Sequence, residues 1–116
     1  MPHFVIDCSE NILRIHPPEK ILQAVHDTAE ATHLFKKGDI KVRLRTFEHF
    51  TVGHSKSDFI HIFGNLMEGR TIEQKADLSK QIVKKLKEMF AEVPVISINL
   101  REFEKATYCN RNLLDS

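Results

Sequence analysis

The chain has 116 residues, 41% of them hydrophobic and 28% charged, a balance that is typical of one globular domain and excludes a disordered tail. Its formal net charge of +1, from 17 Lys and Arg against 16 Asp and Glu, provides no broad surface for nucleic acid or a membrane. No apolar run reaches membrane-spanning length, and the first residues lack the basic start and long apolar stretch of a secretion signal, so we expect a cytoplasmic protein.

The first half of the chain predicts a strand, a helix and a second strand. The first strand covers residues 2–8, PHFVIDC, and the second covers residues 40–47, IKVRLRTF, in which apolar and basic side chains alternate from residue 40 to residue 45. Between them residues 17–35 have the pattern of a helix with two prolines in its first turn, and Gly38 ends this unit. The expected buried face of the helix comprises Ile21, Leu22, Val25, Ala29 and Thr32.

The second half repeats this order. A long strand is predicted over residues 58–67, DFIHIFGNLM, where Gly64 indicates a bulge or a close backbone approach. The sequence TIEQ at residues 71–74 has the pattern of a capping box for a helix over residues 72–92, and a fourth strand follows at residues 95–102. The expected buried face of this helix comprises Ile72, Ala76, Ser79, Val83, Leu86 and Phe90.

Corresponding positions in the two halves are separated by a nearly constant offset. We therefore predict an α+β domain built from two copies of one β-α-β unit, at about residues 2–47 and 58–101, in a single four-stranded sheet with both helices on one face. The other face then needs a cover, and a second subunit is the expected one. The tail over residues 104–116 has too little pattern to stand alone, and we expect it to dock on a neighbouring subunit.

Pro2 follows the initiator Met directly, so removal of Met1 would leave a secondary amine at the start of the first strand. An α-amino group titrates near ~7.7–8.0, and burial or a nearby cation lowers that pKa toward the value that suits a general base. A proline that merely starts an edge strand, where its missing N–H has no consequence, is the plainer interpretation.

Three cations strengthen the catalytic interpretation. Lys41 and Arg43 project from one face of the second strand, and Arg70 lies just before the second helix, where backbone N–H groups also favour anions. Arginine is well shaped to hold a carboxylate with two parallel hydrogen bonds. Most such charges form a solvated strand face instead, which is the competing interpretation.

Metal and thiol chemistry are poorly supported. None of the seven histidines has a recognised zinc spacing, and the two cysteines, Cys8 and Cys109, lie far from one another with no CxxC motif, so we expect free thiols and no metal site. There is no GxSxG elbow for a serine nucleophile.

Four segments together resemble the 5-carboxymethyl-2-hydroxymuconate isomerase family of the tautomerase superfamily: PHFVIDCSENI, GDIKVRLRTF, DFIHIFGNLMEGRTIEQK and ISINLREFEKATYCNRN. The resemblance implies a duplicated β-α-β fold assembled as a homotrimer, with Pro2 as the catalytic base after removal of Met1. It further implies that Arg70, with Lys41 and Arg43, binds the carboxylates of a small-molecule substrate. No cofactor is implied, and the implied setting is the breakdown of aromatic acids.

One residue departs from the family pattern, because Lys41 stands where the resemblance leads us to expect arginine. Lysine keeps the charge but loses the planar fork, so the preferred substrate is left open. Two alternatives therefore stand beside an isomerase of this type: a tautomerase that acts on a different enol, and a non-enzymatic trimeric binding module, which would tolerate an N-terminus blocked by a retained Met1.

Overall fold

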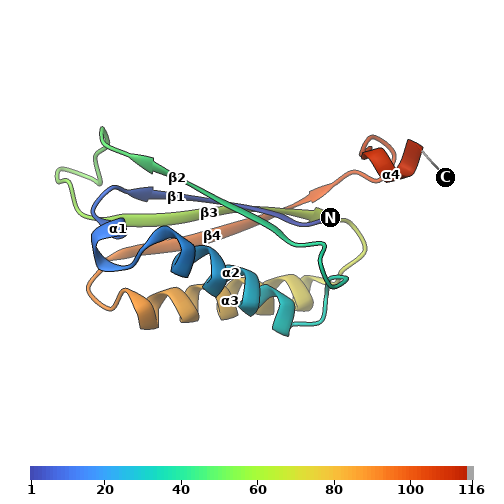
Figure 1. Cartoon of the computed structure of the whole chain (residues 1–116), viewed down its shortest axis with the longest axis horizontal. Helices are drawn as coiled ribbons and strands as arrows, with labels where there is room; N and C mark the ends of the chain where they lie inside the picture. Colours follow the sequence, from blue (N-terminus) through green and yellow to red (C-terminus); the bar gives the residue numbers. More distant parts are fainter. Residues whose placement is uncertain (115–116) are drawn as a thin grey trace.

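The computed structural model describes residues 1–114, which form one mixed β-sheet with two long helices packed on one of its faces (Figure 1). The strands are β1 (His3–Ser9), β2 (Lys41–Phe47), β3 (Phe59–Met67) and β4 (Val95–Phe103). The helices are α1 (Ile12–Ile15), α2 (Pro18–Ala31), α3 (Ile72–Met89) and α4 (Arg111–Leu114). In the described part of the chain no helix is both long and apolar enough to cross a membrane.

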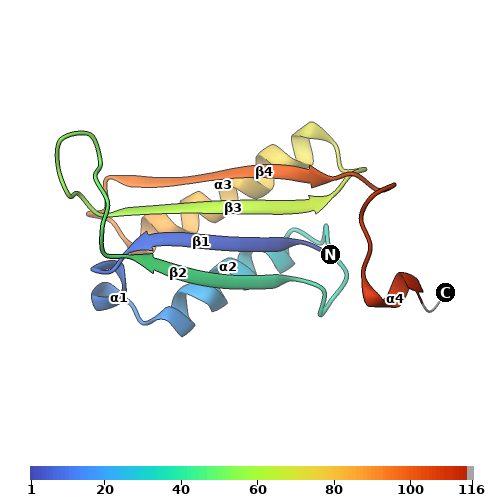
Figure 2. The same cartoon turned by 90° about the horizontal axis from the view of Figure 1, so that it is seen from above.

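The sheet has the strand order β2-β1-β3-β4, seen from above in Figure 2. β1 pairs with β2, and β3 with β4, in parallel, whereas the two central strands β1 and β3 run antiparallel. A parallel pair needs a crossover connection, and α2 and α3 provide the two crossovers. The predicted order of elements and the four-stranded α+β sheet are confirmed, while the duplication of the two halves stays a prediction.

The core lies between the sheet and the two long helices. Even-numbered side chains of the strands face the helices, as the period of two requires. The strands contribute the fully buried Phe4, Ile6, Cys8, Ile60, Ile62 and Leu66, and the helices contribute Ile21, Val25, Leu78, Ile82 and Leu86. Burial, helped by the charge of Asp7, raises the pKa of the Cys8 thiol to about 11, so this thiol is protonated at neutral pH.

The first long helix is shorter than predicted. α2 ends at Ala31, and His33 takes up a left-handed backbone conformation with a φ of 59°. This turn sends the chain back toward the sheet, where Phe35 is buried against Phe4, at 6.3 Å between ring centroids. The expectation of a helix that continues to residue 35 was therefore wrong.

The second long helix begins as predicted but buries a different face. Thr71 Oγ1 accepts a hydrogen bond from the Gln74 N–H at 3.0 Å and Gln74 Oε1 accepts one from the Thr71 N–H at 2.9 Å, which confirms the capping box. Ile72, however, is 76% exposed, and the expected face, which began with it, was wrong except at Leu86 and Phe90. The helix instead turns Leu78, Ile82 and Leu86 toward the sheet.

The face of the sheet opposite the helices carries the odd-numbered side chains, and no helix of residues 1–114 covers it (Figure 1). Asp7 on β1 pairs with Arg45 on β2, and the Nδ1 of His61 on β3 lies 2.6 Å from the Ser97 hydroxyl on β4. Phe63 is 45% exposed on this open face. The open face thus carries paired polar side chains on all four strands and the exposed ring of Phe63.

We predict that Gly64→Ala destabilises the fold, because Gly64 lies where β3 passes Phe4 and Leu100. A Cβ atom there would lie 2.5 Å from Cδ2 of Leu100 and 3.1 Å from Cδ1 of Phe4. Overpacking of this kind costs about 1–3 kcal/mol of unfolding free energy, measurable by denaturant titration. Leu100→Val should recover part of the loss in the double variant, and an unchanged denaturation midpoint in Gly64→Ala would contradict the close approach.

Candidate functional site

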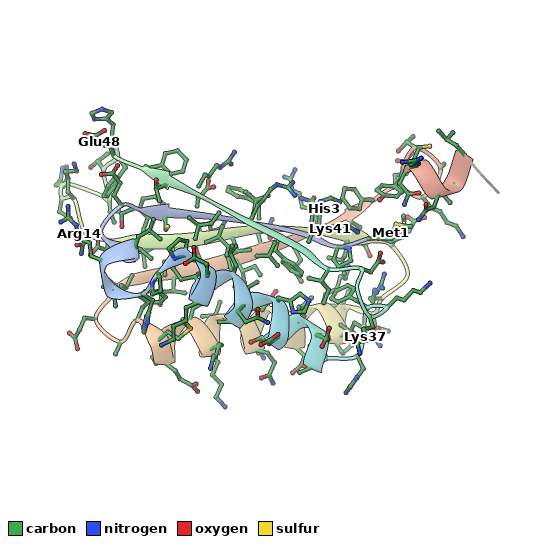
Figure 3. All side chains as sticks on the ribbon, in the orientation of Figure 1. Met1, His3, Arg14, Lys37, Lys41 and Glu48 are labelled. Carbon is green, nitrogen blue, oxygen red and sulfur yellow. The ribbon has the colours of Figure 1, made fainter. Side chains whose placement is uncertain are left out.

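The predicted site residues lie toward one end of the sheet. β1 and β2 begin at this end, and β3 and β4 finish at it (Figure 2). Two connections also lie here: residues 32–40, which run from α2 to β2, and residues 68–71, which run from β3 to α3. Figure 3 shows Met1, His3 and Lys41 together at this end, with Arg14 and Glu48 at the opposite end. We call this region the amino end of the sheet.

Pro2 is buried at the amino end, and its carbonyl oxygen accepts a hydrogen bond from the Lys41 N–H at 3.0 Å. The amine at the head of the described chain belongs to Met1, so the Pro2 nitrogen is an amide. That amine binds the carboxylate of Asp39 and donates to the Asp39 carbonyl oxygen at 3.3 Å. Removal of Met1 would place a secondary amine one residue further along, within a few ångströms of the same carboxylate.

The electrostatic surroundings of this amine push in opposite directions. Burial lowers the pKa of the Met1 amino group below its ordinary value, and the charge of Lys41 lowers it further, whereas the hydrogen bond and the charge of Asp39 act to raise it. The net direction is downward. An amine at this place is therefore more often neutral at pH 7 than a free one.

Lys41 and Arg43 lie on the open face, as predicted. Lys41 Nζ donates to the carbonyl oxygen of Asp39 at 2.7 Å and lies 3.4 Å from its Oδ1 atom. Arg43 Nη1 donates to the Nδ1 atom of His3 at 3.1 Å. Burial, followed by the charges of Arg43 and Lys41, lowers the pKa of His3, so His3 is neutral and accepts this bond at pH 7.

Arg70 is held apart from these two cations. Its Nη2 donates to the Leu34 carbonyl at 2.7 Å, its Nη1 donates to the Met67 carbonyl at 3.2 Å, and its guanidinium lies 5.0 Å from the centre of the Phe35 ring. Arg70 therefore joins the 32–40 connection to the end of β3. A guanidinium has five N–H donors, so these two bonds leave others for an anion.

Two features of the amino end escaped the sequence analysis. The first is Asp39, whose only sequence signal is an acid directly before a basic strand that starts beside Pro2. The second is the return of the tail to the same end: Asn110 Nδ2 lies 3.4 Å from the Met1 sulfur, and the Tyr108 ring packs on Phe103 at 4.9 Å. The tail thus contacts the first residue of its own chain through residue 110, while residues 115–116 of the predicted docking segment lie outside the described residues.

Among residues 1–114 no three His, Cys, Asp or Glu side chains lie close enough together to hold a metal ion. A cavity of about 730 Å³ lies between α2 and α3, and one of about 210 Å³ lies beside Ser9 and Lys56 at the opposite end of the sheet. Neither is lined by Pro2, Lys41, Arg43 or Arg70.

The chain resembles known proteins in sequence and in fold. The chain is 25% identical over 93 residues, which are 78% of it and 74% of the relative, to the 5-carboxymethyl-2-hydroxymuconate Delta-isomerase of Escherichia coli. Its fold matches the crystal structure of a 5-carboxymethyl-2-hydroxymuconate isomerase from Deinococcus radiodurans R1 with a TM-score of 0.83, at 22% identity over 95% of this chain and 88% of that one. A fused 4-OT wild-type symmetric trimer matches with a TM-score of 0.79, at 16% identity over 95% of this chain and 92% of the other.

The comparison with protein families covers every residue from Pro2 onward. Residues 2–116 match the model of the family described as CHMI, 5-carboxymethyl-2-hydroxymuconate isomerase, and the chain therefore belongs to that family.

Proposed function

We propose that this protein is an isomerase that moves a proton on an unsaturated 2-hydroxy or 2-oxo acid with two or three carboxylates, similar to 5-carboxymethyl-2-hydroxymuconate. The observation that supports this most is the burial of Pro2 beside Lys41 at the amino end of a chain of this family. In this proposal the protein works in the breakdown of aromatic acids, in the cytoplasm.

The proposed base is the secondary amine of Pro2 after Met1 is removed. The neutral amine takes a proton from a carbon next to the conjugated system, and the resulting ammonium returns it to another carbon. Burial and Lys41 lower the pKa of an amine at this place, which favours the neutral form that a base requires. The substrate's own carbonyl accepts the electrons in the dienolate, so the proposed reaction requires no cofactor.

The proposed role of the cations is to hold carboxylates and to stabilise the dienolate oxygen. Lys41 and Arg43 lie two positions apart on β2, on the same face as His3, and so present charge along one edge of the site. Arg70 would contribute through the donors that its two carbonyl bonds leave unused. Such charge-assisted bonds are most effective where water is excluded.

Lys41 favours one alternative activity. A lysine ammonium is a point charge and does not select the planar, two-bond geometry of a carboxylate, so a different enolic acid could be the better substrate for the same Pro2. Initial rates on a panel of enolic mono-, di- and tricarboxylates decide between the two. A non-enzymatic binding module is the third reading, and a natural N-terminus blocked by Met1 would favour it.

We propose a homotrimer as the assembled state. The open face carries exposed Phe63 and partly buried strand residues, and α4 adds Leu114, which is 77% exposed. Three such sheets can bury their open faces against one another around a common axis. In this assembly an adjoining subunit would also lie close to the amino end.

We predict that sedimentation equilibrium shows three chains per particle, and that Phe63→Asp breaks the assembly. A carboxylate at position 63 would be buried without a partner in the interface. Ile72→Asp is the matched control, because Ile72 is exposed at the start of α3, on the helix layer. A wild-type monomer at micromolar concentration, or equal effects of the two variants, would contradict the proposed interface.

We predict that activity requires a free Pro2 amine. Protein whose first residue is Pro2 should isomerise the dicarboxylate enol, whereas protein that retains Met1 should be inactive, since its Pro2 nitrogen is an amide without a basic lone pair. Pro2→Ala with Met1 removed leaves a primary amine, so its kcat should fall without vanishing. Intact mass identifies each form, and equal rates for the processed and the Met1-retaining proteins would rule out proline chemistry.

We predict that Arg70→Ala lowers kcat/KM, with a loss of transition-state stabilisation on the order of 2–4 kcal/mol. This is the usual effect of losing one charged donor from such a site. Because Leu34 and Met67 also lose a donor, the free energy of unfolding should fall by about 1–3 kcal/mol. Rates are measured at a temperature where circular dichroism shows both proteins fully folded.

Phe35→Leu serves as the control for Arg70, since it loosens the same connection but leaves the charge in place. It should lower stability without an equal loss of kcat/KM. If Phe35→Leu loses as much rate as Arg70→Ala, the role of Arg70 is structural, and if Arg70→Ala keeps the wild-type rate, Arg70 takes no part in the reaction.

A further inference from the structure

We propose that Asp39 is a specificity-determining residue of this site: its carboxylate holds Lys41 and faces the N-terminal amine in the free protein, and a substrate carboxylate displaces it from Lys41. This inference rests on the proposed function, because it concerns the same amine and the same cation. It adds a negative charge to a site otherwise described by its positive ones.

The contacts of Asp39 are those of a residue that links two functional groups. Its carboxylate binds the Met1 amine and lies 3.4 Å from Lys41 Nζ, and its carbonyl oxygen accepts from both nitrogens, at 3.3 and 2.7 Å. Asp39 comes two residues before Lys41, in the connection from α2, so β2 fixes its position relative to the start of β1. No other carboxylate contacts either nitrogen in the described chain.

The same geometry persists in outline when Met1 is removed. Backbone nitrogens of successive residues lie no more than about 4 Å apart, so the amine that forms on Pro2 stays within reach of the Asp39 charge. Around it stand Lys41 from β2, and His3 with its Arg43 partner one step along β1 and β2. Asn110 from the tail adds only a neutral amide. Among these groups Asp39 therefore carries the one negative charge, beside the positive charges of Lys41 and Arg43.

The pairing of Asp39 with Lys41 is suited to exchange. The two side chains are 36% and 46% exposed, and ion pairs at such exposure are weak. A substrate carboxylate can take the place of Asp39 on Lys41 without leaving a buried charge unpaired. The displaced Asp39 carboxylate still faces the amine, where it stabilises the ammonium formed when the base accepts a proton.

The test is Asp39→Asn in protein whose first residue is Pro2. Removing the competing charge should lower KM for the dicarboxylate enol by about two- to fivefold, the range expected for an exposed ion pair. Removing it should also lower the pKa of the Pro2 amine, because a negative neighbour raises that pKa, and the rising limb of kcat/KM should move to lower pH. Lys41→Gln should move the same limb to higher pH.

Asp77→Asn is the matched control, since it makes the same change of charge at an exposed position on α3. It should leave KM and the pH profile as in the wild type. Nuclear magnetic resonance of a ¹⁵N-labelled Pro2 gives the amine pKa without reference to turnover, and calorimetry with adipate as an inert dicarboxylate gives an affinity.

These measurements separate the two proposals. If the wild type turns over an enolic acid but Asp39→Asn leaves KM, the adipate affinity and the amine pKa unchanged, the inference about Asp39 is wrong and the proposed function stands. If the wild type is inert on every enolic acid, the proposed function fails, and with it the substrate part of the inference. A downward shift of the amine pKa in Asp39→Asn, absent from Asp77→Asn, then supports its remaining part, the contact of Asp39 with the amine.

Discussion

The antiparallel pairing of β1 with β3 is the constraint on which the rest of the molecule depends. Each half of the chain forms a parallel pair around one helix, and this central pairing joins the two halves into one sheet. Because β1 and β3 run in opposite directions, the start of β1 lies beside the end of β3. Phe4 pairs with Gly64, which brings Pro2 and the connection after Met67 to the same end of the sheet. A shift by one residue would turn every core side chain of one half toward the open face.

The 32–40 connection shows how local stability and chemistry are joined in this fold. Arg70 fixes the connection at Leu34, Phe35 anchors it in the core, and a few residues later it delivers Asp39 and Lys41 to the first residues of β1. We therefore expect a change at Arg70 to affect, through this connection, charges that Arg70 does not contact. Rate measurements alone would confuse this indirect effect with loss of a ligand, which is why the loop must be perturbed independently.

Much of the fold could be predicted from the sequence, because alternation along the strands and the capping box at Thr71 are local signals. The errors arose where the local sequence pattern fitted two structures equally well. Two stripes of α3 fit the helical period equally, and only contact with the sheet selects the one with Leu78 and Ile82. The end of α2 depends on the left-handed backbone conformation of His33, which is hard to predict from sequence for residues other than glycine and asparagine. In the site, Pro2 and Lys41 were candidates from their residue types and from the resemblance, and the parallel pairing of β1 with β2 places the two residues side by side. Asp39 and the carbonyl partners of Arg70 were missed because they come from a loop whose path depends on tertiary contacts.

The burial of Cys8 has a consequence for how the protein responds to oxidants. One thiol is locked inside the core on β1 with its pKa raised to about 11, and the other, Cys109, is exposed on the tail. The two cannot meet unless β1 leaves the sheet. Oxidation of the folded protein therefore begins at Cys109, and any disulfide that forms without unfolding joins separate molecules or a small thiol to the tail. Asn110, the residue after Cys109, contacts Met1. A modification of Cys109 would therefore add bulk beside the amino end, while the thiol of Cys8 in the core stays unmodified.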